Sequence, residues 1–311
     1  MKKGKTFVLF ISILTLLNCT LINRFSQGWE YLGDAPFLAR AWHSLDSYNN
    51  KLIIIGGERF ALEAGGADYH LHDIWTSSDG EKWELITDNA IFDNPDKHKT
   101  IEFLGELWLF TDSSYYKSSN GSSWSQVISG ESYIGNSAKV IFKNYLWSLS
   151  GNEIKKSSDG IHWEIITTNA GFNNQEPGWD GYTVCSHNGK MWVFSGYPYL
   201  NDRTINKSFV YSSSDGINWT IINESAPCRA RVGAKSVVYD EKIWIIGGYL
   251  GFGINSNEVW ATKDGIIWEQ HNEGDEIPGL RNPGVAIFND CLYMIGGYFF
   301  DNGIWRYKKG I

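Results

Sequence analysis

A pattern of apolar and polar positions recurs along the chain at intervals of about 40 to 55 residues. Its most regular part is an apolar position followed directly by a second large side chain. The first column is Leu52, Leu107, Leu146, Met191, Ile243 and Leu292, and the second is Ile53, Trp108, Trp147, Trp192, Trp244 and Tyr293. Neighbouring residues of a strand point to opposite faces, so each pair marks one strand. Four residues before the first column, across a polar turn such as Asn49-Asn50 or Asp240-Glu241, lie Tyr48, Phe103, Phe142, His187, Tyr239 and Phe288. Each copy therefore predicts a β-hairpin.

A second hairpin follows in five copies, marked by Asp-Gly or Asn-Gly and a Trp three residues after the Gly. The segments are Ser78 to Trp83, Ser119 to Trp124, Ser158 to Trp163, Ser214 to Trp219 and Lys263 to Trp268. Asp-Gly and Asn-Gly favour two-residue type I′ turns, in which both central residues have positive φ. We therefore expect such a turn at each of these sites.

Four strands per unit are typical of a propeller blade, and six units predict a six-bladed, all-β propeller over residues 28–311. The strand that carries the two columns ends in Gly56-Gly57 in the first unit, and in Ser-Gly or Gly-Gly in most others. The last unit lacks a fourth strand, because Trp305 occupies its third and the chain ends at Ile311. The segment from Gly28 to Leu32 resembles the missing strand. Its pairing beside Trp305 would close the ring and remove an exposed edge.

The repeats resemble kelch-type repeats, as in the galactose oxidase propeller. The resemblance rests on the Gly-Gly strand ends, a Trp near the end of each unit and the Arg of Arg40-Ala41-Trp42-His43. The Ser-x-Asp-Gly-x-x-Trp segments also resemble the Asp-box of sialidase-like propellers, with one residue fewer between Asp and Gly. The resemblance implies an architecture, and says little about activity.

The amino terminus resembles a bacterial export signal. Three lysines among the first five residues precede an apolar run, Phe7 to Leu17, that is too short to span a bilayer. Leu16-Leu17-Asn18-Cys19 resembles a lipobox, although Asn18 departs from the usual small residue. We therefore expect a signal peptide over 1–18, lipidation at Cys19, and a linker over 19–27; plain cleavage and a retained anchor are the alternatives. Because Thr20 is not Asp, the outer membrane or the cell surface is the expected location.

The formal net charge of −8 and the pI of 5.4 argue against nucleic acid as a partner, because phosphate binding requires a basic face. Cys185, Cys228 and Cys291 have no metal or redox spacing, which leaves buried free thiols or a Cys185–Cys228 bridge. The His70-x-His72 pair is weak evidence for a metal. We predict a monomer with no cofactor and no metal site.

Arginines are the strongest candidates for a binding site. Arg40 and Arg231 lie sixteen residues before a Gly-Gly pair and Arg281 lies fifteen before one. Their blades, one, five and six, are neighbours in a closed ring, so these side chains, joined by Arg229, could converge on a carboxylate or sulfate. The alternative is a structural role, in which the guanidinium groups pair with carbonyls and acids of the blades.

Long connections between the second and third strands favour one face of the ring as the binding surface. Trp42, Trp179 and Tyr197 are candidate stacking surfaces for sugars, and Glu58 and Glu63 are candidate acids. Ordinary packing and strand-end cover are the alternatives for these residues. The expected function is a non-catalytic propeller, displayed on the envelope, that binds a protein or a glycan. The alternative is a carbohydrate-active enzyme that resembles sialic acid mutarotases or sialidases.

Overall fold

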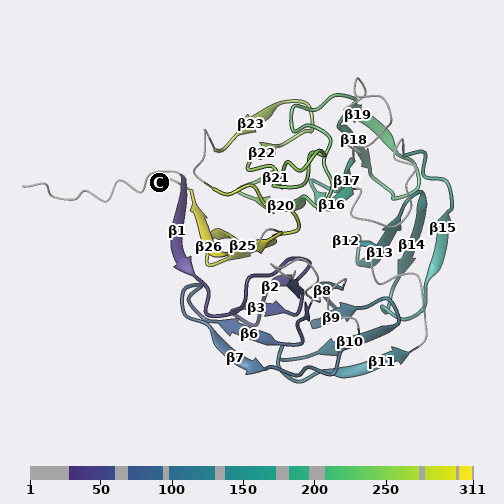
Figure 1. Cartoon of the computed structure of the whole chain (residues 1–311). Coiled ribbons are helices and arrows are strands. Elements are labelled where there is room, and N and C mark those ends of the chain that lie inside the picture. Colours follow the sequence, from purple (N-terminus) through teal and green to yellow (C-terminus); the bar gives the residue numbers. More distant parts are fainter. Residues whose placement is uncertain are drawn as a thin grey trace, which may run out of the picture.

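Six four-stranded antiparallel sheets form a ring around a central axis (Figure 1). The structure is a computed structural model, and it describes residues 28–59, 69–93, 98–129, 137–172, 182–195, 207–272, 277–298 and 301–309. All elements in these residues are strands, and none of these residues forms a helix that could cross a membrane. The chain therefore has the predicted six-bladed β-propeller fold.

The first three blades follow the chain from the inside of the ring outwards. Blade one contains β2 (Ser44–Tyr48), β3 (Lys51–Ile55), β6 (Ile74–Ser77) and β7 (Glu84–Thr87). Blade two contains β8 (Lys99–Phe103), β9 (Glu106–Phe110), β10 (Ser114–Ser118) and β11 (Ser125–Ser129). Blade three contains β12 (Ala138–Phe142), β13 (Tyr145–Ser150), β14 (Glu153–Ser157) and β15 (Glu164–Thr167).

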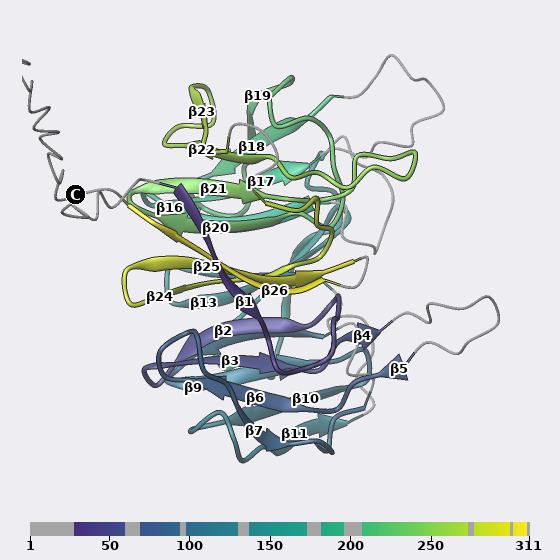
Figure 2. The same ribbon diagram turned by 60° about the vertical axis from the view of Figure 1, so that its left-hand side comes forward.

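Blades four and five repeat the same order. Blade four contains β16 (Tyr182–His187), β17 (Lys190–Ser195), β18 (Phe209–Ser213) and β19 (Thr220–Asn223). Blade five contains β20 (Lys235–Tyr239), β21 (Lys242–Ile246), β22 (Val259–Thr262) and β23 (Trp268–Gln270). A small hairpin of β4 (Glu58–Arg59) and β5 (Tyr69–His70) projects from blade one (Figure 2).

The sixth blade joins the two ends of the chain. It combines β24 (Gly284–Phe288), β25 (Cys291–Gly297) and β26 (Asp301–Lys308) with β1 (Gly28–Asp34), which supplies the outer strand. Trp29 lies opposite Tyr307 and Tyr31 lies opposite Trp305. The ring is thus closed by the predicted amino-terminal strand, which covers the edge that β26 would otherwise expose.

Two-residue turns with positive φ at both positions join the first and second strands of every blade. They are Asn49-Asn50, Leu104-Gly105, Lys143-Asn144, Asn188-Gly189, Asp240-Glu241 and Asn289-Asp290. This is type I′ geometry, whose twist matches that of the flanking strands. The short turn predicted between these strands is confirmed, and blade two has Leu104-Gly105 in place of polar residues.

The Asp-Gly and Asn-Gly segments form wider loops, and the expected two-residue turns at these sites were wrong. In blade one the loop runs between β6 and β7, and Gly80 has positive φ whereas Asp79 does not. The Ser77 hydroxyl accepts a hydrogen bond from the Gly80 amide at 2.8 Å, and the Asp79 carboxylate accepts from the amides of Glu81 and Lys82. Side-chain acceptors thus hold a longer loop, which a reading of the dipeptide alone misses. The same bonds recur around Asn120, Asp159, Asp215 and Asp264.

The glycines of these loops fix the contact between neighbouring blades. A Cβ atom on Gly160 would lie 2.9 Å from the Trp108 ring, and one on Gly216 would lie 2.4 Å from the Trp147 ring. Both rings belong to the second column, on the preceding blade. The column therefore packs against the loop backbone of the next blade, where only glycine leaves room.

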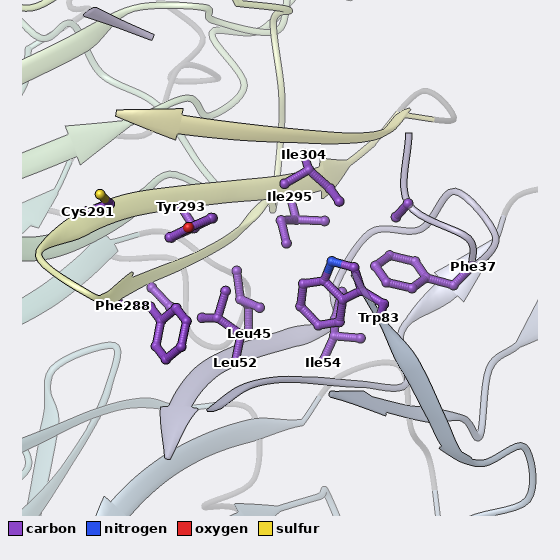
Figure 3. Packing of buried hydrophobic residues seen from close by; sticks show 12 residues of the cluster. Phe37, Leu45, Leu52, Ile54, Trp83, Phe288, Cys291, Tyr293, Ile295 and Ile304 are labelled. Atoms are coloured by element: carbon purple, nitrogen blue, oxygen red, sulfur yellow. The ribbon is translucent and has the colours of Figure 1, made fainter. Parts of the chain in front are cut away.

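The seam between the last and first blades is packed with apolar side chains (Figure 3). Leu45, Leu52 and Ile54 of blade one meet Phe288 and Ile295 of blade six, and all five are buried. Phe37, in the connection from β1, packs edge-on against Trp83 at a centroid distance of 5.4 Å. Burial of this kind stabilises the ring by roughly 1.5–3 kcal/mol for each large side chain.

The three described cysteines are all free and buried, so the alternative Cys185–Cys228 bridge is not formed. Cys185 and Cys228 belong to one apolar cluster between blades four and five. Burial raises the pKa of the Cys185 thiol to about 12, which keeps it protonated at neutral pH.

Candidate binding site at the channel mouth

A cavity of about 240 Å³ occupies the centre of the ring and is lined by residues of all six blades. Its wall includes the first residues of the inner strands, among them Ser44, Lys99 and Lys235, and the end of β13 at Ser150. In every blade the inner strand begins, and the second strand ends, on one side of the ring. The connections between second and third strands begin on that side too. We call this side the long-loop face, and the side with the type I′ turns the short-turn face. The cavity therefore opens towards the long-loop face.

Lysine side chains line the cavity. We call the last residues of the inner strands, Tyr48, Phe103, Phe142, His187, Tyr239 and Phe288, the inner aromatic column. Lys99 in β8 and Lys235 in β20 lie four residues before this column, and Lys139 in β12 lies three before it. Burial and the nearby charge of Lys99 hold the pKa of Lys139 well below its usual range, while Asp112 acts in the opposite direction. The Lys139 amino group donates hydrogen bonds to the Ser137 hydroxyl at 2.7 Å and to the Ser137 carbonyl oxygen at 3.2 Å.

Asp46, in β2, is the one acid among the described residues of the cavity wall. The Thr100 hydroxyl of the next blade donates a hydrogen bond to its carboxylate. Burial raises the pKa of Asp46 to about 6, although this hydrogen bond and the charge of Lys235 partly oppose the shift. A carboxyl group with this pKa changes protonation close to neutral pH, as a general acid or base must.

The guanidinium groups of Arg40 and Arg231 bond to residues of their own blades. The Arg40 side chain is fully buried and donates two hydrogen bonds to the Asp73 carboxylate, at 2.6 and 2.7 Å, and one to the Gly56 carbonyl oxygen. Arg231 repeats this arrangement with Glu258 at 2.5 Å and the Gly247 carbonyl oxygen. These contacts favour the structural alternative for both arginines, because neither guanidinium group presents a free edge to a ligand.

Arg229 is more exposed, but it shares the carboxylate of Glu258 with Arg231. One acid thus neutralises two guanidinium groups in blade five. Arg281 is displaced by one residue from the arginine position, which Leu280 occupies in blade six. Arg40, Arg229 and Arg231 are thus each bonded to an acid. Among the described arginines predicted to converge on one ligand, this leaves Arg281 as the candidate.

Arg281 lies among three aromatic rings on the long-loop face. The centre of its guanidinium group is 5.1 Å from the ring centre of Tyr249, 5.7 Å from that of Trp42 and 5.9 Å from that of Tyr298. Its Nε atom is buried and has no hydrogen-bond partner, and the residue as a whole is partly exposed. We call Arg281, Trp42, Tyr249 and Tyr298 the rim cluster. It combines cation–π contacts with a charge that is not paired with an acid in any described contact.

Trp42 has an unusual backbone conformation within the rim cluster. Its φ of +55° lies in the left-handed region, at the position that Gly233 occupies in blade five and Asn282 in blade six. Glycine and asparagine tolerate this region, whereas a bulky residue there is strained by about 1–3 kcal/mol. The strain is concentrated next to the cavity, whose wall includes Trp42.

An ordered loop of blade five extends the rim cluster. Tyr249 pairs with Val232 and with Asn255 through isolated bridges, and its hydroxyl accepts a hydrogen bond from the Gly253 amide. The loop presents Phe252 and Ile254, whose side chains are 70% and 57% exposed. These exposed apolar side chains make the loop a candidate contact surface.

The remaining candidates divide into those that the structure describes and those that it does not. Glu58 exchanges two backbone hydrogen bonds with Ala41, which places it beside the segment that carries Trp42. Glu63, Trp179, Tyr197 and Cys19 lie outside the described residues. Within the described part of the chain, no three His, Cys, Asp or Glu side chains gather as they would around a metal ion.

Sequence reasoning missed the lysines and Asp46. The signal was present in the aligned repeats, because polar residues occupy positions two to four before the inner aromatic column, on strands that otherwise alternate apolar residues. Scans against protein-family models and curated proteins find no match for this chain.

Proposed function

We propose that this kelch-type propeller is a non-catalytic binding protein that takes an acidic ligand, a glycan or a protein, at the long-loop face. The observation that carries the proposal is the rim cluster, where Arg281 lies among three rings beside a cavity lined by lysines. Aromatic rings offer stacking surfaces for sugars or apolar side chains, and the guanidinium group offers paired donors for a carboxylate or sulfate.

The fold also supports display of this face away from a membrane. Gly28, where the described chain begins, pairs with Lys308 at the short-turn end of β26, whereas Asp34 pairs with Gly303 at the other end. A lipid at Cys19 would thus tether the ring through its short-turn side. The nine residues 19–27 could extend roughly 30 Å, enough to keep the propeller clear of the bilayer.

The test compares binding by the wild type, Arg281→Gln and Lys82→Gln on arrays of acidic glycans and acidic proteins. Lys82→Gln removes the same charge from an exposed loop on the short-turn face. Loss of a charge-assisted hydrogen bond corresponds to roughly a tenfold or greater loss of affinity, which we expect for Arg281→Gln alone. Absence of binding to every acidic ligand, or equal losses in both variants, would contradict the proposal.

Asp46 favours one alternative, a carbohydrate-active enzyme. Its pKa of about 6 and its place on the cavity wall suit it to proton transfer at the anomeric centre of a sugar. An assay of sugar mutarotation and glycoside hydrolysis with the wild type and Asp46→Asn tests this alternative. Turnover that Asp46→Asn abolishes would replace the non-catalytic proposal.

A further inference from the structure

Three lysines surround the cavity from three blades. Lys99 and Lys235 occupy the same position of β8 and β20, in blades two and five, which lie opposite each other around the axis (Figure 1). Lys139 lies one position further along in blade three. The cavity wall therefore carries lysines on opposite sides of a space that a single small molecule can fill.

Positive charge exceeds negative charge on this wall. Asp46 is the single acid among its described residues, against Lys99 and Lys235, whereas burial holds the pKa of Lys139 well below its usual range. Lys235 acts on Asp46 and on His43, and Lys99 acts on Lys139. Lys99 and Lys235 thus disfavour further positive charge near them, and a bound anion would relieve this repulsion.

Hydroxyl groups and aromatic rings complete the wall. Ser137, Thr183 and Ser236 line the cavity, and the Thr183 and Ser236 hydroxyls are 2.6 Å apart, in hydrogen-bond contact. Trp42 and Tyr182 contribute rings. The volume of about 240 Å³ is many times the roughly 10–15 Å³ that one ordered water requires.

We propose that the channel binds one carboxylate-bearing sugar unit of the uronic acid type. Its carboxylate lies between Lys99 and Lys235, and its ring hydroxyls bond to the serine and threonine side chains of the wall. This inference rests on the proposed function, because it names the acidic group that the long-loop face selects. Lysines supply charge without the fixed fork of arginine, so the hydroxyls and rings must supply the selectivity for a sugar.

The experiment measures binding of glucuronate and galacturonate by calorimetry at low ionic strength, with glucose, acetate and phosphate as comparison ligands. The double variant Lys99→Gln/Lys235→Gln is expected to weaken uronate binding at least tenfold, and Lys235→Arg to retain it. Lys51→Gln is the matched control, since Lys51 is exposed next to the type I′ turn of blade one. It is expected to bind within twofold of the wild type.

Three results would overturn the inference: no uronate binding by the wild type, uronate binding that the double variant retains, or acetate and phosphate binding as tight as that of the uronates. Lys235→Arg keeps the charge, and it therefore separates loss of charge from loss of structure. Failure here is distinct from failure of the proposed function. Ligands on the array that require Arg281 would leave that function intact even if no monomer entered the channel.

Discussion

The two faces of the ring use their polar residues in opposite ways. On the short-turn face, the Ser, Thr, Asp and Asn side chains of the repeated loops accept hydrogen bonds from their own backbone, and the same bonds recur in five blades. On the long-loop face the blades share fewer contacts, and polar groups gather around a cavity. Contacts that repeat from blade to blade therefore belong to the frame, by which we mean the residues that hold the ring together, and departures from the repeat mark the candidate site.

Arg40 belongs to the frame although it lies on the long-loop side, because its guanidinium group is bonded within blade one. Asp73→Asn would leave its buried guanidinium group without a charged partner, and we expect a loss of about 3–5 kcal/mol of unfolding free energy. Arg281→Gln is expected to change stability by less than about 1 kcal/mol. Urea unfolding of both variants measures the difference.

Blade six provides the control for this prediction, since Leu280 and Gly303 occupy the places of Arg40 and Asp73. Arg40→Leu/Asp73→Gly should therefore be less destabilised than the sum of its single variants. Additive losses would mean that the ion pair does not act as a unit, and Arg40 would no longer belong to the frame.

The blade-to-blade contact at the short-turn face gives the next largest effect. Gly216→Ala places a methyl group against Trp147 and should cost about 3 kcal/mol, combining a positive φ with overpacking. Gly105→Ala has nearly the same φ, but no atom lies within 4 Å of its Cβ. It should cost only about 1 kcal/mol. Equal losses of thermal stability in the two variants would show that the Trp147 side chain does not restrict the space at Gly216.

Asp46 links stability to the candidate site. Its pKa is raised in the folded state, so the folded protein holds this proton more tightly, and its contribution to stability falls as the pH rises from about 4 to about 6. Asp46→Asn should stabilise the protein at pH 8 by on the order of 2 kcal/mol, less than full burial implies because the cavity admits water. At pH 4 the gain should vanish. The same gain at both pH values would refute the burial of the Asp46 charge.

The smallest effect concerns the regular turns. Leu104 is 64% exposed and has a φ of +54° in a position that Asn188 fills in blade four. Leu104→Asn should stabilise the protein by about 0.5–1 kcal/mol, because asparagine tolerates the left-handed region. Asn188→Leu should cost a similar amount. If Leu104→Asn lowered the melting temperature and Asn188→Leu raised it, the stability of these turns would not depend on the left-handed conformation.

The features that recur in every blade could be predicted from the sequence. The columns, the six units and the pairing of the amino-terminal strand beside Trp305 followed from local pattern and from the need to cover a strand edge. The loops around Asp79 escaped prediction because side-chain hydrogen bonds outweigh the dipeptide preference.

The site was less predictable, because its residues come together only through ring closure. The spacing of Arg40 and Arg231 was recognised, but spacing alone does not show which acid each contacts, and Asp73 and Glu258 lie far along the chain. Lys99, Lys139 and Lys235 carry no motif. Their common place on inner strands has meaning only once the axis of the ring is known.

The central claim is that ligands bind at the long-loop face while the short-turn face only builds the ring. Hydrogen–deuterium exchange with and without polygalacturonate tests it most directly, because peptides from each face report separately. The account predicts added protection in peptides that contain Asp46, Lys99, Lys139, Lys235 and Phe252, and unchanged exchange in the loop from Ser77 to Trp83 and its equivalents. Protection centred on those loops, or no change anywhere, would contradict it.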